Sequence, residues 1–352
     1  MAHFIKTLKK TALAASIASL ATVANATIVT SIKPLGFIAS SIADGVTDTE
    51  VLVPAGASPH DYSLKPSDIQ KLQGAELILW VGEDIDAFLD KTLRPMPFKK
   101  VLSIADFAEI GGLLEGEAHD HKHEHVHKHD HAHKHDHAHK HEHDHKHEHD
   151  HKHDHAHKHE HDHKHDYDHK HDHAHGHDHD HSTNWHVWYS PEISKIVATR
   201  LATRLTEAYP EKKEKIAQNL AEFNRTLAEQ SEKIKQQLAP VKEKGFYVFH
   251  DAYSYFNNAY GLKQTGYFTI NPLVAPGAKT LAKIKQEIKE HKVNCLFAEP
   301  QFTPKVIESL SKGTGVHVGR LDPMGDAVKL GVNSYANFLQ YTADSYFACL
   351  SK

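Results

Sequence analysis

The sequence has few cysteines and, after its first 26 residues, no long apolar run. No later stretch reaches the roughly eighteen apolar residues that a membrane-spanning helix requires. Basic residues are not concentrated on any segment, which argues against nucleic-acid binding. The chain also contains no HExxH helix and no serine or cysteine nucleophile in a recognisable setting, which argues against a hydrolase.

Residues 1–26 have the pattern of a secretory signal peptide. Lys6, Lys9 and Lys10 precede an apolar, small-residue run, and Ala24-Asn25-Ala26 matches the small-x-small cleavage pattern. No cysteine follows the cleavage point, so a lipid anchor is not indicated. We therefore predict an exported, soluble mature chain that begins at Thr27 and resides in the periplasm.

Only two cysteines, Cys295 and Cys349, occur in the 352 residues. In an exported protein an isolated pair favours a disulfide, here one that would tie the C-terminus to a predicted strand. A two-thiolate metal site is the alternative. It is disfavoured because the cysteines are far apart in sequence and neither belongs to a CxxC pair.

Histidine is abundant, and 31 of the 37 histidines lie at alternating positions between His119 and His181, interrupted at Tyr167. A local excess of imidazole is a compositional signal for metal binding. The tract has almost no large apolar residues, so we predict a disordered surface loop that collects metal with low affinity. The accessory ligands assigned to it are His119, His121, His123, His125, His127 and His129.

The rest of the chain alternates short apolar strands with helical segments, which predicts parallel sheets built from crossover units. Four strands are predicted before the tract, at 28–34, 49–53, 76–81 and 100–104. Four more are predicted near 245–249, 264–270, 295–298 and 316–321. Between the two sets, apolar residues recur with helical spacing from Glu211 to Leu238, which predicts one long helix.

The predicted fold is therefore α/β with two lobes. Each lobe is a mostly parallel four-stranded sheet flanked by helices, and one long helix joins them, with metal held in the cleft between the lobes. The predicted bounds are a signal peptide at 1–26, an N-terminal lobe at 27–210, a linking helix at 211–239 and a C-terminal lobe at 240–352. The histidine-rich loop, 119–181, is inserted in the N-terminal lobe.

Three histidines outside the tract share a structural context. His60 lies in a turn after a strand, His186 opens a helix among aromatic residues, and His250 ends an apolar strand. Ligands of open α/β sheets bind beyond the carboxyl ends of the strands, so these side chains are candidate metal ligands. A lone histidine at such a place is more often a core or capping residue, but three equivalent positions favour ligation.

Asp322 also follows a strand and is predicted to provide the fourth ligand, with Glu299 and water as alternatives. Three imidazoles and one carboxylate suit Zn(II), whereas two imidazoles with two carboxylates would favour manganese. The sequence therefore predicts a site of His60, His186, His250 and Asp322 that binds Zn(II).

Several segments together resemble the zinc-uptake periplasmic binding proteins of the ZnuA type. They begin at Ser31 (SIKPLGF), Gly56 (GASPHDYSLKPSD), Trp185 (WHVW), Phe249 (FHDAY), Phe297 (FAEPQ) and Leu321 (LDPMG). The resemblance covers essentially the whole mature chain outside the tract. It implies two α/β lobes joined by one rigid helix, with zinc held in the cleft and delivered to an ABC transporter permease in the inner membrane.

By position, the family's ligand histidines fall on His60, His186 and His250, and the carboxylate of related metal-binding lobes falls on Asp322. Some members carry an acid directly before the first histidine, where this chain has Pro59. That difference leaves Asp322 or water for the fourth position.

We therefore expect a monomeric transport component that binds zinc and has no catalytic activity, no nucleic-acid partner and no membrane insertion. The nearest alternative is the same kind of protein with manganese or iron as cargo. More distant alternatives are an exported zinc hydrolase and a zinc buffer in which the tract is the active part.

Overall fold

A computed structural model describes residues 27–116, 183–302 and 305–352 of the chain. The predicted signal peptide and the histidine-rich tract, with its six assigned accessory ligands, lie outside the described residues. Both sheets and the helices that cover them belong to one compact unit.

The first sheet contains four parallel strands in the order β2-β1-β3-β4. These are β1 (Thr27–Thr30), β2 (Asp48–Val51), β3 (Leu77–Trp80) and β4 (Val101–Ser103). β3 is buried along its whole length, as its unbroken apolar sequence requires of a strand covered on both faces. The strand predicted at 28–34 ends early, because Pro34 occupies the first turn of the next helix, where its missing N–H costs nothing.

The second sheet repeats this plan with four parallel strands in the order β10-β9-β7-β8. They are β7 (Phe246–His250), β8 (Gln264–Thr269), β9 (Cys295–Ala298) and β10 (His317–Arg320). β7 and β9 are neighbours at the centre of the sheet and are fully buried. Residues that follow these two strands therefore meet at one edge.

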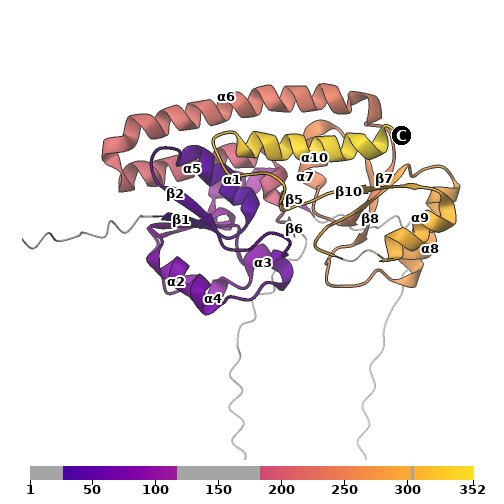
Figure 1. The fold of residues 1–352 in the computed structure, drawn as a ribbon, viewed down its shortest axis with the longest axis horizontal. Coiled ribbons are helices and arrows are strands. Elements are labelled where there is room, and N and C mark those ends of the chain that lie inside the picture. The colour runs from indigo at the N-terminus through magenta and orange to yellow at the C-terminus, as the bar shows by residue number, and fades with distance from the viewer. Residues whose placement is uncertain (1–26, 117–182, 303–304) are drawn as a thin grey trace, which may run out of the picture. The chain divides into compact units, whose positions relative to one another are not determined.

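Helices cover both sheets (Figure 1). Around the first sheet they are α1 (Lys33–Ile42), α2 (Pro66–Gly74), α3 (Glu83–Asp86), α4 (Asp90–Leu93) and α5 (Pro191–Ala208). Around the second sheet they are α7 (Ser254–Tyr260), α8 (Ala278–Lys289), α9 (Lys305–Thr314) and α10 (Ser334–Leu350). Short 3₁₀ turns include η1 (Pro59–Asp61) and η4 (Val187–Tyr189).

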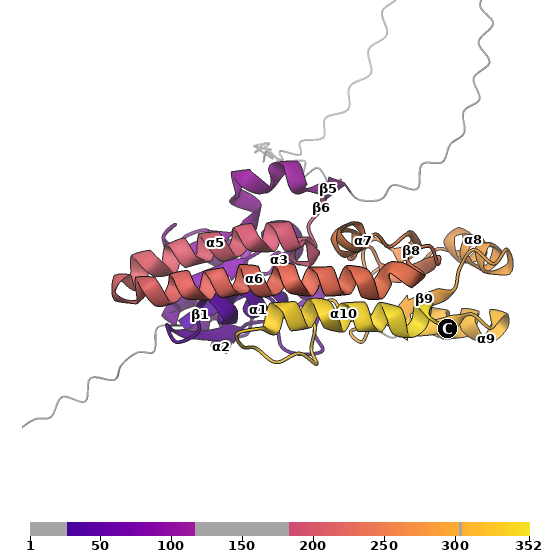
Figure 2. The same ribbon diagram turned by 90° about the horizontal axis from the view of Figure 1, so that it is seen from above.

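The long helix α6 (Lys213–Leu238) runs across both sheets, with α10 beside it (Figures 1 and 2). Its apolar stripe is buried, as Ile216, Phe223, Leu227, Ile234 and Leu238 show. These side chains belong to a core that also includes residues of both sheets. The predicted stripe is therefore core packing, and it holds the two sheets against one continuous helix.

A two-stranded antiparallel ribbon, β5 (Glu115–Gly116) and β6 (Thr183–Asn184), brackets the stretch that is not described. Tyr255, in α7, donates a hydrogen bond from its hydroxyl to the Asn184 carbonyl and accepts one from the Glu115 backbone N–H. These contacts hold β6 against α7, which flanks the second sheet. They therefore also fix the backbone that leads from β6 to His186.

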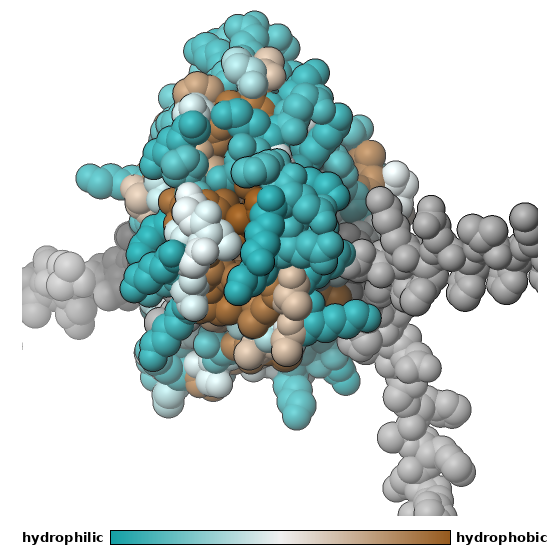
Figure 3. Space-filling view, turned by 90° about the vertical axis from the view of Figure 1, so that its right-hand side faces the viewer, coloured by the Kyte–Doolittle hydropathy of each residue, from teal (hydrophilic) through white to brown (hydrophobic). Residues whose placement is uncertain are grey.

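None of the helices among the described residues is long and apolar enough to cross a bilayer. Viewed from the end that carries the second sheet, the surface is largely hydrophilic with apolar side chains showing between polar ones (Figure 3). Leu273 and Val274, in the loop after β8, are among the exposed apolar residues of the described chain.

Cys295 and Cys349 form a disulfide, which is the pairing expected from the sequence. Cys295 begins β9 and Cys349 lies in the last turn of α10, with 6.2 Å between their Cα atoms. Both residues are buried in the main core. The bond therefore fixes the end of α10, which packs along α6, to the central part of the second sheet.

We predict that the double variant C295S/C349S loses about 4 kcal/mol of unfolding free energy, the value that chain entropy assigns to a loop of about 55 residues. Urea titrations of the zinc-free variant and of the oxidised wild type measure the difference. The reduced wild type is the control and should behave like the variant. Equal midpoints for all three forms would contradict the prediction.

Candidate metal centre

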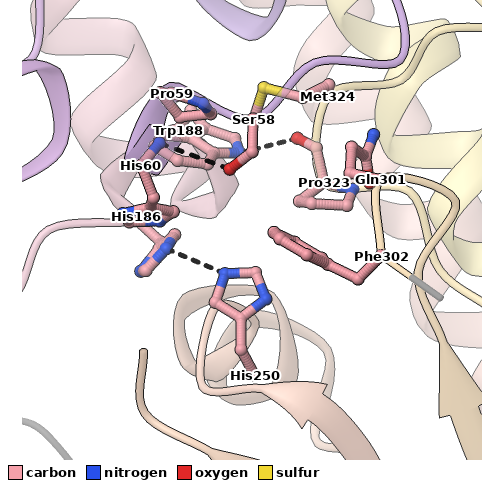
Figure 4. Close-up of a pocket in the computed structure, with 10 residues that line it drawn as sticks. All are labelled: Ser58, Pro59, His60, His186, Trp188, His250, Gln301, Phe302, Pro323 and Met324. Carbon is pink, nitrogen blue, oxygen red and sulfur yellow. Dashed lines mark hydrogen bonds between the residues drawn. The ribbon is translucent and has the colours of Figure 1, made fainter. Parts of the chain in front are cut away.

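Three histidines far apart in sequence converge at the carboxyl ends of the two sheets. One ligand nitrogen each from His60, His186 and His250 lies within 4.8 Å of the other two. No other group of three or more His, Cys, Asp or Glu with this spacing occurs among residues 27–116, 183–302 and 305–352. The three rings point toward a common centre (Figure 4).

His250 is the last residue of β7 and is 2% exposed. Its Nδ1 lies 2.7 and 2.8 Å from the two carboxylate oxygens of Glu299, the first residue after β9. An ionised carboxylate only accepts hydrogen bonds, so Nδ1 carries the proton and donates. This hydrogen bond directs the Nε2 atom of His250 to the centre.

His186 lies between β6 and η4 and is 8% exposed. Its backbone N–H donates to Oδ1 of Asn184 at 3.1 Å, and the Asn184 amide nitrogen donates to the Asp251 carbonyl at 2.9 Å. These bonds identify Oδ1 as an acceptor, so Nδ1 of His186, 2.7 Å away, must donate to it. The Nε2 atom of His186 is left unprotonated in turn.

The Nε2 atoms of His186 and His250 face each other at 3.2 Å. At this distance a proton on one of them makes a hydrogen bond to the other, and a metal cation can take the place of that proton. Zn–N bonds of about 2.0–2.1 Å in a tetrahedral complex place ligand nitrogens about 3.3–3.4 Å apart. The observed spacing is close to one edge of such a tetrahedron.

His60 comes to the centre from the loop that follows β2. Pro59 opens the turn η1, and Ser58 caps it by accepting the His60 backbone N–H at 3.3 Å. The His60 ring centroid lies 5.6 Å from that of His186 and 5.7 Å from that of His250. The first sheet thus provides the third imidazole of a group whose other rings come from β7 and from the segment after β6.

Burial keeps the imidazoles of His60 and His186 neutral. Desolvation, followed by the proximity of His250, lowers the pKa of His60 to about 3. The same two causes, with a further contribution from His60, lower the pKa of His186 well below its usual value. Imidazole must be neutral to bind a metal, so these residues are ready to bind it throughout the physiological pH range.

Two pockets adjoin the histidines. One, of about 10 Å³, is lined by all three rings together with apolar side chains that include Trp188, Phe302 and Met324 (Figure 4). The other, of about 300 Å³, is lined by His60 and His186 and by polar residues that include Asp84 and Asp251. Because the larger pocket has room for water, it can supply a solvent ligand for the fourth position.

Asp322, the expected fourth ligand, is not part of the group. Its Oδ1 accepts hydrogen bonds from Gln301 Nε2 at 2.8 Å and Met324 N at 3.0 Å, and its Oδ2 accepts one from Asp326 N at 2.7 Å. Both oxygens are therefore used to hold the turn after β10. The grouped ligand atoms are those of the three imidazoles, and Asp322 as a fourth ligand stays a prediction.

Glu299, considered from the sequence as a rival ligand, lies behind His250. It also accepts a hydrogen bond from the Tyr253 hydroxyl at 3.0 Å, and it is 2% exposed. Sequence reasoning did not identify this role, nor that of Asn184. The position of Glu299 just after an apolar strand was a usable signal, but its partner depends on β7 and β9 being neighbours.

The family model for the zinc-uptake complex component A, periplasmic, matches residues 28–349. The chain belongs to this family. A high-affinity zinc uptake system protein ZnuA from Haemophilus influenzae is 67% identical over 347 residues, covering 99% of each chain. Its namesake from Haemophilus ducreyi is 52% identical over 345 residues, covering 98% of this chain and 99% of that one.

Solved structures share the fold. A crystal structure of ZnuA covers 92% of this chain and 99% of its own, with a TM-score of 0.65 and 21% identity. The periplasmic zinc-binding protein TroA from Treponema pallidum covers 93% of this chain and 100% of its own, with a TM-score of 0.64 and 16% identity. The predicted architecture of two parallel four-stranded sheets with a long helix is confirmed.

The low pKa of His60 predicts that the zinc-free protein loses stability in acid. Between pH 6.5 and 3 the unfolded chain binds a proton at this residue and the folded chain does not, so acid favours unfolding. From pH 7 to pH 5 this residue should account for a loss of about 2 kcal/mol. Urea midpoints measured across this range should fall more steeply for the wild type than for His60→Gln.

The matched control for this pH series is His317→Gln, because His317 is exposed on β10. That variant should follow the wild type at every pH. Parallel curves for the wild type and His60→Gln would contradict the low pKa.

Glu299 holds the Nδ1 atom of His250, so we expect Glu299→Gln to weaken zinc binding by about 10- to 100-fold. Competition with a chelator of known affinity provides the measurement. Glu308→Gln is the matched control, because Glu308 is exposed on α9, a helix that packs against β9 and β10. Unchanged affinity in Glu299→Gln would show that the carboxylate does not act on the metal.

Proposed function

We propose that this protein captures Zn(II) at His60, His186 and His250 and supplies it for import. The observation that carries the proposal is the convergence of three imidazoles, with the Nε2 atoms of His186 and His250 held 3.2 Å apart. A hydrogen-bond acceptor at Nδ1 orients each ring: Asn184 for His186 and Glu299 for His250. Membership in the family of zinc-uptake complex components supports the same cargo.

Zinc is favoured over manganese or iron by the ligand atoms. The described residues bring three imidazole nitrogens together, and the carboxylates of Asp322 and Glu299 are engaged elsewhere. Manganese prefers oxygen ligands, whereas three neutral nitrogens and one water form a common tetrahedral zinc environment. Water from the larger pocket is the proposed fourth ligand.

The transport role is proposed to be that of a binding component without chemistry of its own. The two sheets are proposed to act as lobes, 27–210 and 240–352, that close on the metal from either side of the linking helix at 211–239. His60 and His186 belong to the first lobe and His250 to the second. Zinc can therefore be held when the lobes are closed and released when they part.

The location and partner follow from the same proposal. Residues 1–26 have the pattern of a signal peptide, and the family is described as periplasmic. We propose that the protein works as a periplasmic monomer and delivers zinc to the permease of an inner-membrane ABC transporter. The histidine-rich tract, 119–181, is proposed to be an accessory collector or sensor of zinc.

Titration calorimetry with zinc tests the assignment. A variant that lacks residues 119–181 should bind one zinc tightly per chain, because the three ligands lie outside the tract. Adding His250→Ala to that variant should abolish tight binding, whereas removing four tract histidines from the full chain should leave it intact.

Manganese is the matched competitor in the same titrations and should not displace zinc at equal concentration. Equal losses from His250→Ala and from the tract substitutions would favour a zinc buffer. Absence of tight zinc binding in the deletion variant would refute the assignment of the site.

A further inference from the structure

The turn that follows β10 is organised by the carboxylate of Asp322. Its hydrogen bonds to the backbone N–H groups of Met324 and Asp326 fold residues 322–326 into a compact turn, and Gln301 attaches this turn to the end of β9. The Gly325 backbone N–H closes the same turn by donating to the Asp322 carbonyl at 3.1 Å. The turn is thus fixed to the second sheet.

Asp326 extends from this turn to the loop that carries His60. Its Oδ2 accepts the backbone N–H of Gly56 at 2.6 Å, although the two residues are 270 positions apart. Lys33, at the start of α1, donates from Nζ to the Asp326 carbonyl at 2.7 Å. The first sheet and its connecting loop are therefore held to the turn through both the side chain and the backbone of Asp326.

The loop between β2 and η1 depends on Gly56 for its course. Gly56 has a φ of +77°, a left-handed conformation that favours glycine, and the Ala57 backbone N–H donates to the Pro54 carbonyl across it at 3.1 Å. Four residues after Gly56 comes His60. A shift of the Gly56 peptide therefore moves the Ser58 cap and, with it, the imidazole of His60.

The same turn also contacts the segment that carries His186. The Trp188 indole nitrogen donates to the Pro323 carbonyl at 3.2 Å, and its ring lies 5.2 Å from the His186 ring. The loop that carries His60 and the segment that carries His186 thus both contact residues 322–326. The third, His250, lies on the second sheet to which the turn is fixed.

We propose that Asp326 is a positioning residue for metal binding, which holds the His60 loop in its ligating position by accepting the Gly56 N–H. The inference rests on the proposed function and adds a residue that touches no metal. A hydrogen bond to a carboxylate is stronger than one between neutral groups, and this one pins a loop whose residues 54–56 are exposed. Its loss frees His60 to leave the metal.

Zinc dissociation measured by mixing the loaded full-length protein with excess chelator tests the role. Asp326→Ala should release zinc about tenfold faster, since one charge-assisted hydrogen bond is lost, with little change in the association rate. Asp326→Asn keeps an oxygen that accepts the Gly56 N–H but loses the charge, so its dissociation rate should lie between those of the wild type and Asp326→Ala. Asp44→Ala, which removes an ion pair with Lys215 away from the histidines, is the matched control and should not change the rate.

A double-mutant cycle separates positioning from general loss of stability. In a His60→Ala background the effect of Asp326→Ala on zinc affinity should disappear, whereas in a His186→Ala background it should persist. The thermal midpoint of the zinc-free Asp326→Ala protein should match that of Asp44→Ala.

Two results would overturn the inference. One is wild-type dissociation in Asp326→Ala, and the other is an equal effect in both histidine backgrounds. If the wild type itself binds no zinc tightly, or if His250→Ala binds as tightly as the wild type, the proposed function fails instead. The two failures are therefore distinguishable in one set of measurements.

Discussion

The close approach of two imidazole nitrogens, from His186 and His250, is the constraint on which the rest of the site depends. At 3.2 Å one proton or one metal cation can bridge the two atoms, and burial opposes the protonation of His186. The fold maintains this arrangement because Asn184 and Glu299 hold the outer nitrogens. The same spacing is close to that of two nitrogen ligands of one zinc ion, so the hydrogen bonds that hold the rings also hold them at a ligating distance.

Holding these rings requires two sheets to keep a fixed relation, and several elements contribute to it. α6 presents one buried apolar stripe to a core that includes residues of both sheets, and α10 packs beside it with its end tied to β9 by the disulfide. Nearer the metal centre the connections are polar. Asn184 bonds to the Asp251 backbone, and Asp326 bonds to Gly56. Apolar packing against α6 and α10 holds the two sheets together, whereas these hydrogen bonds orient the segments that carry the histidines.

Much of the fold was predictable from local patterns. Short apolar runs such as 76–81 and 295–298 became buried parallel strands, and the helical spacing from Glu211 to Leu238 became α6. The position of histidines just beyond strands was also informative, because parallel strands end at a common edge. Asp322 satisfied the same positional rule and yet does not join the group. Its oxygens are taken by the N–H groups of a turn whose conformation no local pattern announces.

The sequence by itself determined the strands, the long helix, the cysteine pair and the three histidines, because each depends on residue type and on near neighbours along the chain. Only the tertiary structure decided which nitrogen of each buried ring faces the centre and which carboxylate stays away from it. These outcomes depend on contacts between residues as distant as Gly56 and Asp326, or His250 and Glu299. The order of strands in each sheet and the packing of both sheets on α6 bring such residues together, and neither is encoded in the spacing along the chain.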